Sequence, residues 1–171
     1  MADQSATTRP SFIDYRAFVW RDTVIVAVTL ALWFAHNKTP LEGAAGYACG
    51  VLTGICALQL HEWGHIWGAF RSGADIYPPK HWWNPFMFSL DHTTNTREQF
   101  IAVSLPAFAA TAVYLSLFLV VLPRDTLPGK TALVMGLVTA SLTVLIELPL
   151  FARVYRGAKL PAVELFKRPH H

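Results

Sequence analysis

The sequence is organised into long apolar runs separated by shorter polar stretches. A helix needs about 20 mostly apolar residues to cross the hydrocarbon core of a bilayer. Each run is close to or above that length, so the pattern predicts four membrane-spanning helices. Their expected ranges are residues 18–35, 43–70, 100–122 and 131–151.

This pattern is typical of an all-α membrane protein with four transmembrane helices. We expect residues 1–17 to form a polar amino-terminal arm, and residues 18–152 to form one transmembrane domain. Residues 153–171 contain five Lys and Arg residues and are predicted to be a basic cytoplasmic tail.

The stretch between the second and third helices, residues 71–99, is the longest break between apolar runs. It contains three prolines and a group of large apolar side chains, namely Tyr77, Trp82, Trp83, Phe86, Met87 and Phe88. Such a segment is not expected to lie free in water. It is expected either to rest in the membrane interface or to re-enter the membrane over a site, where irregular backbone is tolerated only if it is buried. The sequence leaves both arrangements open.

Composition and charge agree with a membrane protein. Hydrophobic residues make up 53% of the chain and charged residues 15%, with a net charge of +3. The basic residues are scattered among the loops and concentrated after the last apolar run, a distribution that does not suggest nucleic-acid binding. Segments rich in Lys and Arg alternate with poorer ones, which predicts that both termini and the 71–99 loop are cytoplasmic. We therefore expect a multi-pass protein of the bacterial inner membrane.

The first half of the second apolar run is rich in glycine. Gly43, Gly46, Gly50 and Gly54 recur at spacings of three and four residues, so they share one stripe of a helix. Small residues at this spacing let a neighbouring helix approach closely. We therefore expect another span to pack against this stripe.

The second half of the same run carries the segment His61-Glu62-Trp63-Gly64-His65. Each helical residue turns about 100°, so His61 and His65 lie one above the other and can bind one metal ion. Glu62 can then reach a water on that metal and act as its general base. Two imidazoles and a Glu at this spacing form the helical zinc motif. The alternative, three ionisable residues without a joint role, is disfavoured because such groups are destabilising inside a membrane span.

Catalytic zinc usually takes three protein ligands, so one more ligand is expected. Glu147 is the first candidate because it lies six residues before Arg153 in the fourth run, as His65 lies six residues before Arg71. Both helices are expected to run in the same direction, which places the two side chains at one depth. The competing role for Glu147 is a hydrogen-bonded or Arg-paired carboxylate near the interface. Alternative third ligands are Asp91, His92 and, less favoured, His81.

The segment His61-Glu62-Trp63-Gly64-His65, followed by Ala69 and Gly73, resembles the active-site helix of site-2 protease-type intramembrane metalloproteases. These proteases typically carry H-E-x-G-H. The segment that ends in Ser104-Leu105-Pro106 is similar to the start of the family's next span, where Ala-Gly-Pro is usual. The resemblance covers residues 43–122 and implies cleavage of a membrane-embedded peptide bond by metal-activated water.

The fourth run departs from the family's pattern. The family normally has an Asp-Gly ligand motif there, whereas this chain has Ile146-Glu147-Leu148-Pro149. The first functional expectation is a zinc metalloprotease, with zinc held by His61, His65 and Glu147 and with Glu62 as the catalytic base. It would act on a membrane-embedded protein or peptide. The alternative is a non-proteolytic membrane protein or assembly subunit that retains the fold. Both are compatible with a homo- or hetero-oligomer in the lipid bilayer.

Overall fold

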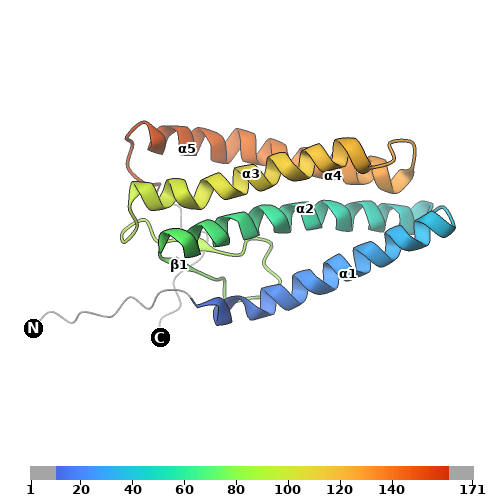
Figure 1. The fold of residues 1–171 in the computed structure, drawn as a ribbon, viewed down its shortest axis with the longest axis horizontal. Coiled ribbons are helices and arrows are strands. Elements are labelled where there is room, and N and C mark those ends of the chain that lie inside the picture. Colours follow the sequence, from blue (N-terminus) through green and yellow to red (C-terminus); the bar gives the residue numbers. More distant parts are fainter. Residues whose placement is uncertain (1–10, 162–171) are drawn as a thin grey trace, which may run out of the picture.

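The computed structural model describes residues 11–161, most of which are helical (Figure 1). The elements in order are η1 (Phe12–Tyr15), α1 (Arg16–Lys38), α2 (Gly43–Ser72), β1 (Ile76–Tyr77), β2 (Ser89–Leu90), α3 (Arg97–Val121), α4 (Leu127–Leu142), η2 (Thr143–Glu147) and α5 (Leu148–Tyr155). Four continuous helical segments are long and apolar enough to cross a membrane: Phe12–Lys38, Gly43–Ser72, Arg97–Val121 and Leu127–Tyr155. They confirm the prediction of a mostly helical chain with four helices of spanning length.

The first helix begins earlier than the sequence predicts. It starts at Phe12 instead of residue 18. Ser11 caps this start, because its side chain accepts a hydrogen bond from the Ile13 N–H. Tyr15 is fully buried in the main hydrophobic cluster of the described residues. Residues 12–17, expected to lie in the polar arm, are thus helical, and burial of Tyr15 ties this segment to the bundle.

The fourth helix also begins earlier than expected, at Leu127 instead of residue 131. The Thr126 side chain accepts a hydrogen bond from the Gly129 N–H, and Pro128 occupies the first turn, where its missing N–H is not needed. Helical structure then continues to Tyr155, so the first residues of the expected tail are helical. Residues 1–10 and 162–171, which include the remainder of the predicted arm and tail, lie outside the described residues.

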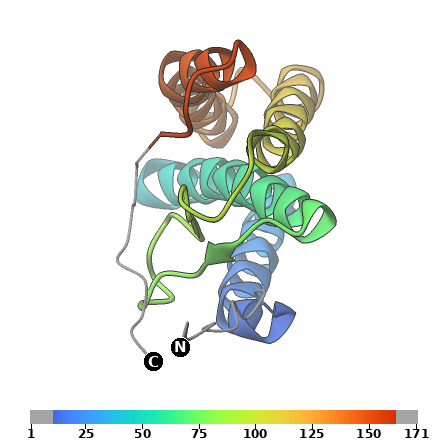
Figure 2. The same cartoon turned by 90° about the vertical axis from the view of Figure 1, so that its left-hand side faces the viewer.

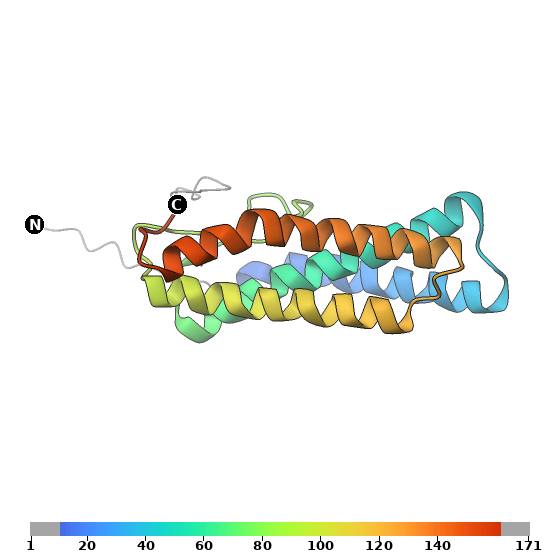
Figure 3. The ribbon, with the colours of Figure 1, turned by 90° about the horizontal axis from the view of Figure 1, so that it is seen from above.

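Consecutive long helices run in opposite directions, and α2 contacts α1, α3 and α4 (Figures 1 and 2). The start of α1, the loop 73–96 and the end of α5 consequently lie at one end of the bundle. The connections 39–42 and 122–126 lie at the other end, as the view from above shows (Figure 3). This arrangement places the second half of α2 beside the long loop.

The glycine stripe of α2 packs against α4, as the sequence predicts, at three of its four positions. A Cβ atom added at Gly46, Gly50 or Gly54 would overlap atoms of α4. Gly43 is different, because no atom lies within 4 Å of such a Cβ and its φ of +53° is one that favours glycine. The prediction of helix packing is therefore wrong for Gly43, which begins the helix instead.

The loop 73–96 folds back against the helices instead of extending from them. Its two short strands pair in antiparallel fashion, with Ile76 opposite Leu90 and Tyr77 opposite Ser89. The segment between the strands exposes three aromatic side chains and buries Met87 completely. The exposed residues are Trp82, Trp83 and Phe86.

Arg21 of α1 anchors this loop. One of its terminal nitrogens donates hydrogen bonds to the backbone oxygens of Trp82 and Asn84, at 2.8 and 2.7 Å. Its Nε donates to Asp22 at 2.7 Å, and both side chains are only about a tenth exposed. Asp22 also accepts hydrogen bonds from two side chains of α2, Gln59 and Trp63. The polar network therefore joins α1, α2 and the loop at one place.

The antiparallel arrangement predicts the outcome of a topology experiment. Reporter fusions after Lys38 and after Arg124 should report the same side of the membrane, because both residues lie at one end of the bundle. A fusion after Lys80, in the loop, should report the opposite side. Measurement of a periplasm-active and a cytoplasm-active reporter at all three sites checks this. Equal signals after Lys38 and Lys80 would mean that α2 does not cross the membrane.

Candidate metal centre

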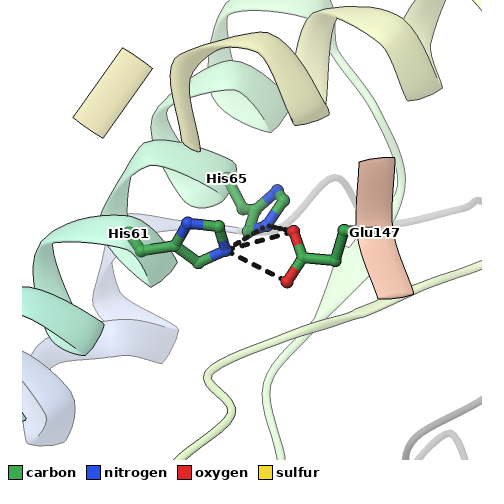
Figure 4. A group of neighbouring side chains, drawn as sticks. All are labelled: His61, His65 and Glu147. Atoms are coloured by element: carbon green, nitrogen blue, oxygen red, sulfur yellow. Dashed lines mark hydrogen bonds and ion pairs between the residues drawn. The ribbon is translucent and has the colours of Figure 1, made fainter. Parts of the chain in front are cut away.

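Three potential ligand side chains converge in the half of the bundle nearest the loop (Figure 4). His61 and His65 project from consecutive turns of α2, and Glu147 projects from the end of η2. The Nε2 atoms of the two histidines are 3.1 Å apart. The Glu147 carboxylate lies 3.2 Å from Nε2 of His61 and 3.5 Å from Nε2 of His65. Residues 86 positions apart in the sequence therefore share one small volume.

These distances fit a single metal ion. Ligand atoms at about 2.0–2.2 Å from a tetrahedral zinc ion lie roughly 3.3–3.6 Å from one another. The three ligand atoms of this group all lie within 4.8 Å of one another, with the two histidines buried. Two imidazole nitrogens and one carboxylate oxygen also match the donor set of catalytic zinc, which leaves one position for water.

The other ring nitrogens of the two histidines are held by α3. Nδ1 of His65 lies 3.1 Å from the backbone oxygen of Val103, and Nδ1 of His61 lies 3.2 Å from that of Ala107. The Thr111 hydroxyl is a further partner of His61 Nδ1, at 2.8 Å. A carbonyl oxygen can only accept, so each Nδ1 carries a hydrogen, and in the neutral ring each Nε2 then presents a lone pair. Metal-binding histidines are commonly oriented in this way.

Three electron-rich groups thus face one another, and this arrangement requires a positive charge. A proton on one Nε2 would satisfy only part of the group. Oε2 of Glu147 is buried and receives no hydrogen bond, although both Nε2 atoms lie within 3.5 Å of it. An ion bound at the centre would contact all three groups at once, so the group could hold a metal ion.

A π-helical segment brings Glu147 into position. In η2 the Leu148 N–H bonds to the Thr143 oxygen five residues earlier instead of four. Pro149 gives the physical reason, because it has no N–H and its ring would clash with the carbonyl four residues before it in a regular helix. Widening of the turn relieves this conflict, and π segments are frequent at functional sites. In the sequence, Pro149 two residues after Glu147 is the signal of this irregular turn, and no π segment was predicted from it.

Two further glycines of α2 allow the close contact with α3 on which the histidine bonds depend. A Cβ at Gly64 would lie 2.7 Å from Cα of Ala107 and 2.9 Å from the carbonyl carbon of Pro106. Gly68 lies against the backbone of Ala102, whose oxygen cannot bond to an N–H of Pro106. Sequence reasoning identified the first glycine stripe of α2 and missed this second one.

Glu62 lies beside the ligand group and is held by the loop. Its side chain is buried, and its Oε2 accepts a hydrogen bond from the Met87 N–H at 2.9 Å. Glu62, His65 and Glu147 all line one cavity of about 380 Å³. The predicted general base and two of the three predicted ligands are therefore in contact with the same cavity, which His61 does not line.

The alternative third ligands lie elsewhere. Within residues 11–161, His61, His65 and Glu147 form the group that could hold a metal, and neither Asp91 nor His92 is part of it. Asp91 instead accepts hydrogen bonds from the backbone and hydroxyl of Thr93. His81 stacks on Trp83, with ring centroids 4.4 Å apart. His170 and His171 lie outside the described residues.

Comparison with known proteins adds no family assignment. No protein-family model, curated protein or solved structure matches this chain.

The ligand group predicts the metal content of the purified protein. We expect one divalent ion per chain in detergent, and loss of most of it in His61→Ala, His65→Ala and Glu147→Ala, because each change removes one of three ligands. Asp91→Ala should keep the ion. Elemental analysis of monodisperse protein checks this. Full metal content in Glu147→Ala would contradict the assignment of that residue.

The second glycine stripe predicts a more specific effect. Gly64→Ala should separate α2 from α3 and weaken both Nδ1 hydrogen bonds, which would lower metal affinity by about 10–100-fold. Gly46→Ala is the matched control, because a Cβ there would be as crowded, at 2.7 Å from the Leu41 oxygen, but it packs on Leu127 at the start of α4, far from Glu147. Competition with a chelator of known affinity measures both. Equal affinities in the two variants would show that the α3 contacts do not tune the site.

Proposed function

We propose that this protein is an intramembrane zinc metalloprotease of the site-2 protease type. The observation that carries the proposal is the convergence of His61, His65 and Glu147 on one point beside the buried carboxylate of Glu62. The donor set supports zinc, since two neutral imidazoles and a carboxylate are preferred zinc ligands. Glu147 takes the place of the Asp that the resembling family uses.

The residues of this chain have distinct roles in the proposed hydrolysis. Zinc bound by the three ligands would lower the pKa of a water molecule and polarise the substrate carbonyl. Glu62 accepts the proton as the water oxygen bonds to the carbonyl carbon, and it returns a proton to the leaving nitrogen as the C–N bond breaks. The Met87 N–H positions the Glu62 carboxylate for both transfers. The α3 carbonyls fix the orientation of the two imidazole rings, which would keep their Nε2 atoms directed at a bound ion.

The length and composition of the helices support a site inside the membrane. His65 lies seven residues before the end of α2 at Ser72, which corresponds to about 10 Å along the helix. The site would therefore lie within the cytoplasmic half of the bilayer, with both termini on the cytoplasmic side. Exposed Trp82, Trp83 and Phe86 suit a loop that rests in the interface or dips into the bilayer. The substrate is then a membrane-embedded protein or peptide.

Replacement of the proposed base separates catalysis from metal binding. Glu62→Gln cannot accept a proton, so it should keep the metal and lose about 10²–10⁴-fold in cleavage rate. A set of synthetic single-span peptides in detergent micelles, analysed by mass spectrometry with zinc-loaded protein, provides the measurement. Glu98→Gln makes the same change at an exposed position and should cleave like the wild type.

Two results would count against the protease. Cleavage by Glu62→Gln at the wild-type rate would make Glu62 structural. Absence of cleavage by a wild-type protein that holds its full complement of zinc would favour a non-proteolytic membrane protein that retains the metal.

A further inference from the structure

The cavity beside the metal centre is much larger than the centre requires. It encloses about 380 Å³, whereas an apolar cavity of about 150 Å³ is enough to hold benzene. Glu62, His65 and Glu147 form part of its wall. The space is continuous with the point where the proposed reaction occurs, so a group that fills it would sit next to the reacting bond.

The remaining wall is almost entirely apolar and comes from three parts of the fold. The loop contributes Phe88, α3 contributes Phe100, and the α4–α5 segment contributes Ile146 and Leu150. A charged or strongly polar group placed there would lose its hydration without finding a partner. The lining therefore selects for an apolar occupant.

Two serines are the polar exceptions in this wall, and they differ. Ser104 donates to the backbone oxygen of Phe100 at 2.9 Å, so its hydroxyl is already bonded. Ser89 of β2 is 2% exposed, and its hydroxyl has no hydrogen-bond partner among the described residues. A buried hydroxyl without a partner is destabilising, because it has lost its hydrogen bonds to water without gaining others. A peptide group beside β2 would supply the missing partner.

We propose that this cavity is a specificity pocket that receives a large apolar side chain, such as Leu or Phe, from the residue flanking the cleaved bond. The Ser89 hydroxyl bonds to the main chain of that residue. This inference rests on the proposed protease function and assigns its substrate class: membrane segments with a bulky apolar residue at the cut, in preference to Ala or Asp.

The expected preference is moderate for a physical reason. A side chain of a membrane-embedded substrate leaves lipid instead of water, so the hydrophobic effect contributes little to its transfer. The gain comes from filling a void with van der Waals contacts. We therefore expect Leu to be preferred over Ala by roughly 10-fold in kcat/KM, the low end for a single apolar pocket.

The test uses one cleaved single-span peptide in which the residues flanking the cut are changed in turn to Ala, Leu, Phe and Asp. Leu150→Trp fills the pocket from α5, and Leu148→Trp is its control, because Leu148 is exposed on the same helix and does not line the cavity. With equal zinc content, Leu150→Trp should lose its preference for Leu, so that the kcat/KM values for the Leu and Ala peptides become equal. Leu148→Trp should keep that preference.

A second measurement does not depend on turnover. Zinc-loaded Glu62→Gln should bind the Leu peptide more tightly than the Ala peptide, and adding Leu150→Trp should abolish the difference. Ser89→Ala should lower kcat/KM by about 2–12-fold, the effect of one neutral hydrogen bond. Ser116→Ala, which removes an exposed hydroxyl on α3, is its control.

The outcomes separate the pocket from the protease. Equal rates for Leu and Ala peptides, or an unchanged preference in Leu150→Trp, would contradict the proposed specificity pocket but not the proposed protease function. Absence of cleavage of every peptide by the zinc-loaded protein would overturn both.

Discussion

The hydrogen bonds that the two histidines donate to carbonyl oxygens of α3 are the interactions on which the site depends. They fix the hydrogen on Nδ1 of His61 and His65, and this leaves both Nε2 lone pairs directed at Glu147. The bonds exist only because Gly64 lets α2 approach the backbone of α3 closely. The convergence of three potential ligand atoms is thus a consequence of helix packing, and the group could hold a metal ion.

The loop 73–96 also contacts the site, independently of α3. Its Met87 N–H fixes Glu62, while Arg21 fixes the backbone of the same loop to α1. The bond from Met87 to Glu62 is buried, whereas the bonds from Arg21 to Trp82 and Asn84 are exposed and part-buried, respectively. An irregular segment needs such partners wherever water does not reach its backbone. The loop therefore combines a backbone held by hydrogen bonds to Arg21 and Glu62 with aromatic side chains exposed on its outer side.

The π segment and the cavity are linked as well. Widening of the helix around Glu147 brings its carboxylate to the histidines, and Ile146 and Glu147 of the same segment line the cavity. Pro149 thereby influences both the ligand geometry and the space beside it. On the proposed function, one irregularity in the fourth helix supplies the third ligand and part of the substrate pocket.

The sequence by itself determined the features that depend on local spacing. Apolar runs of sufficient length predicted four helices, and the four-residue separation of His61 and His65 placed both on one face. Glu147 could be favoured from its depth, but Asp91 and His92 stayed open because a loop has no periodicity from which to infer its path. Only the tertiary structure shows that Glu147 lies beside the two histidines, while Thr93 and Asn95 form hydrogen bonds with Asp91 within the loop. It also decided the burial of Tyr15, the role of Gly64 and the hydrogen bond to Glu62. These features are contacts between residues distant in sequence, and no local pattern specifies which of them form.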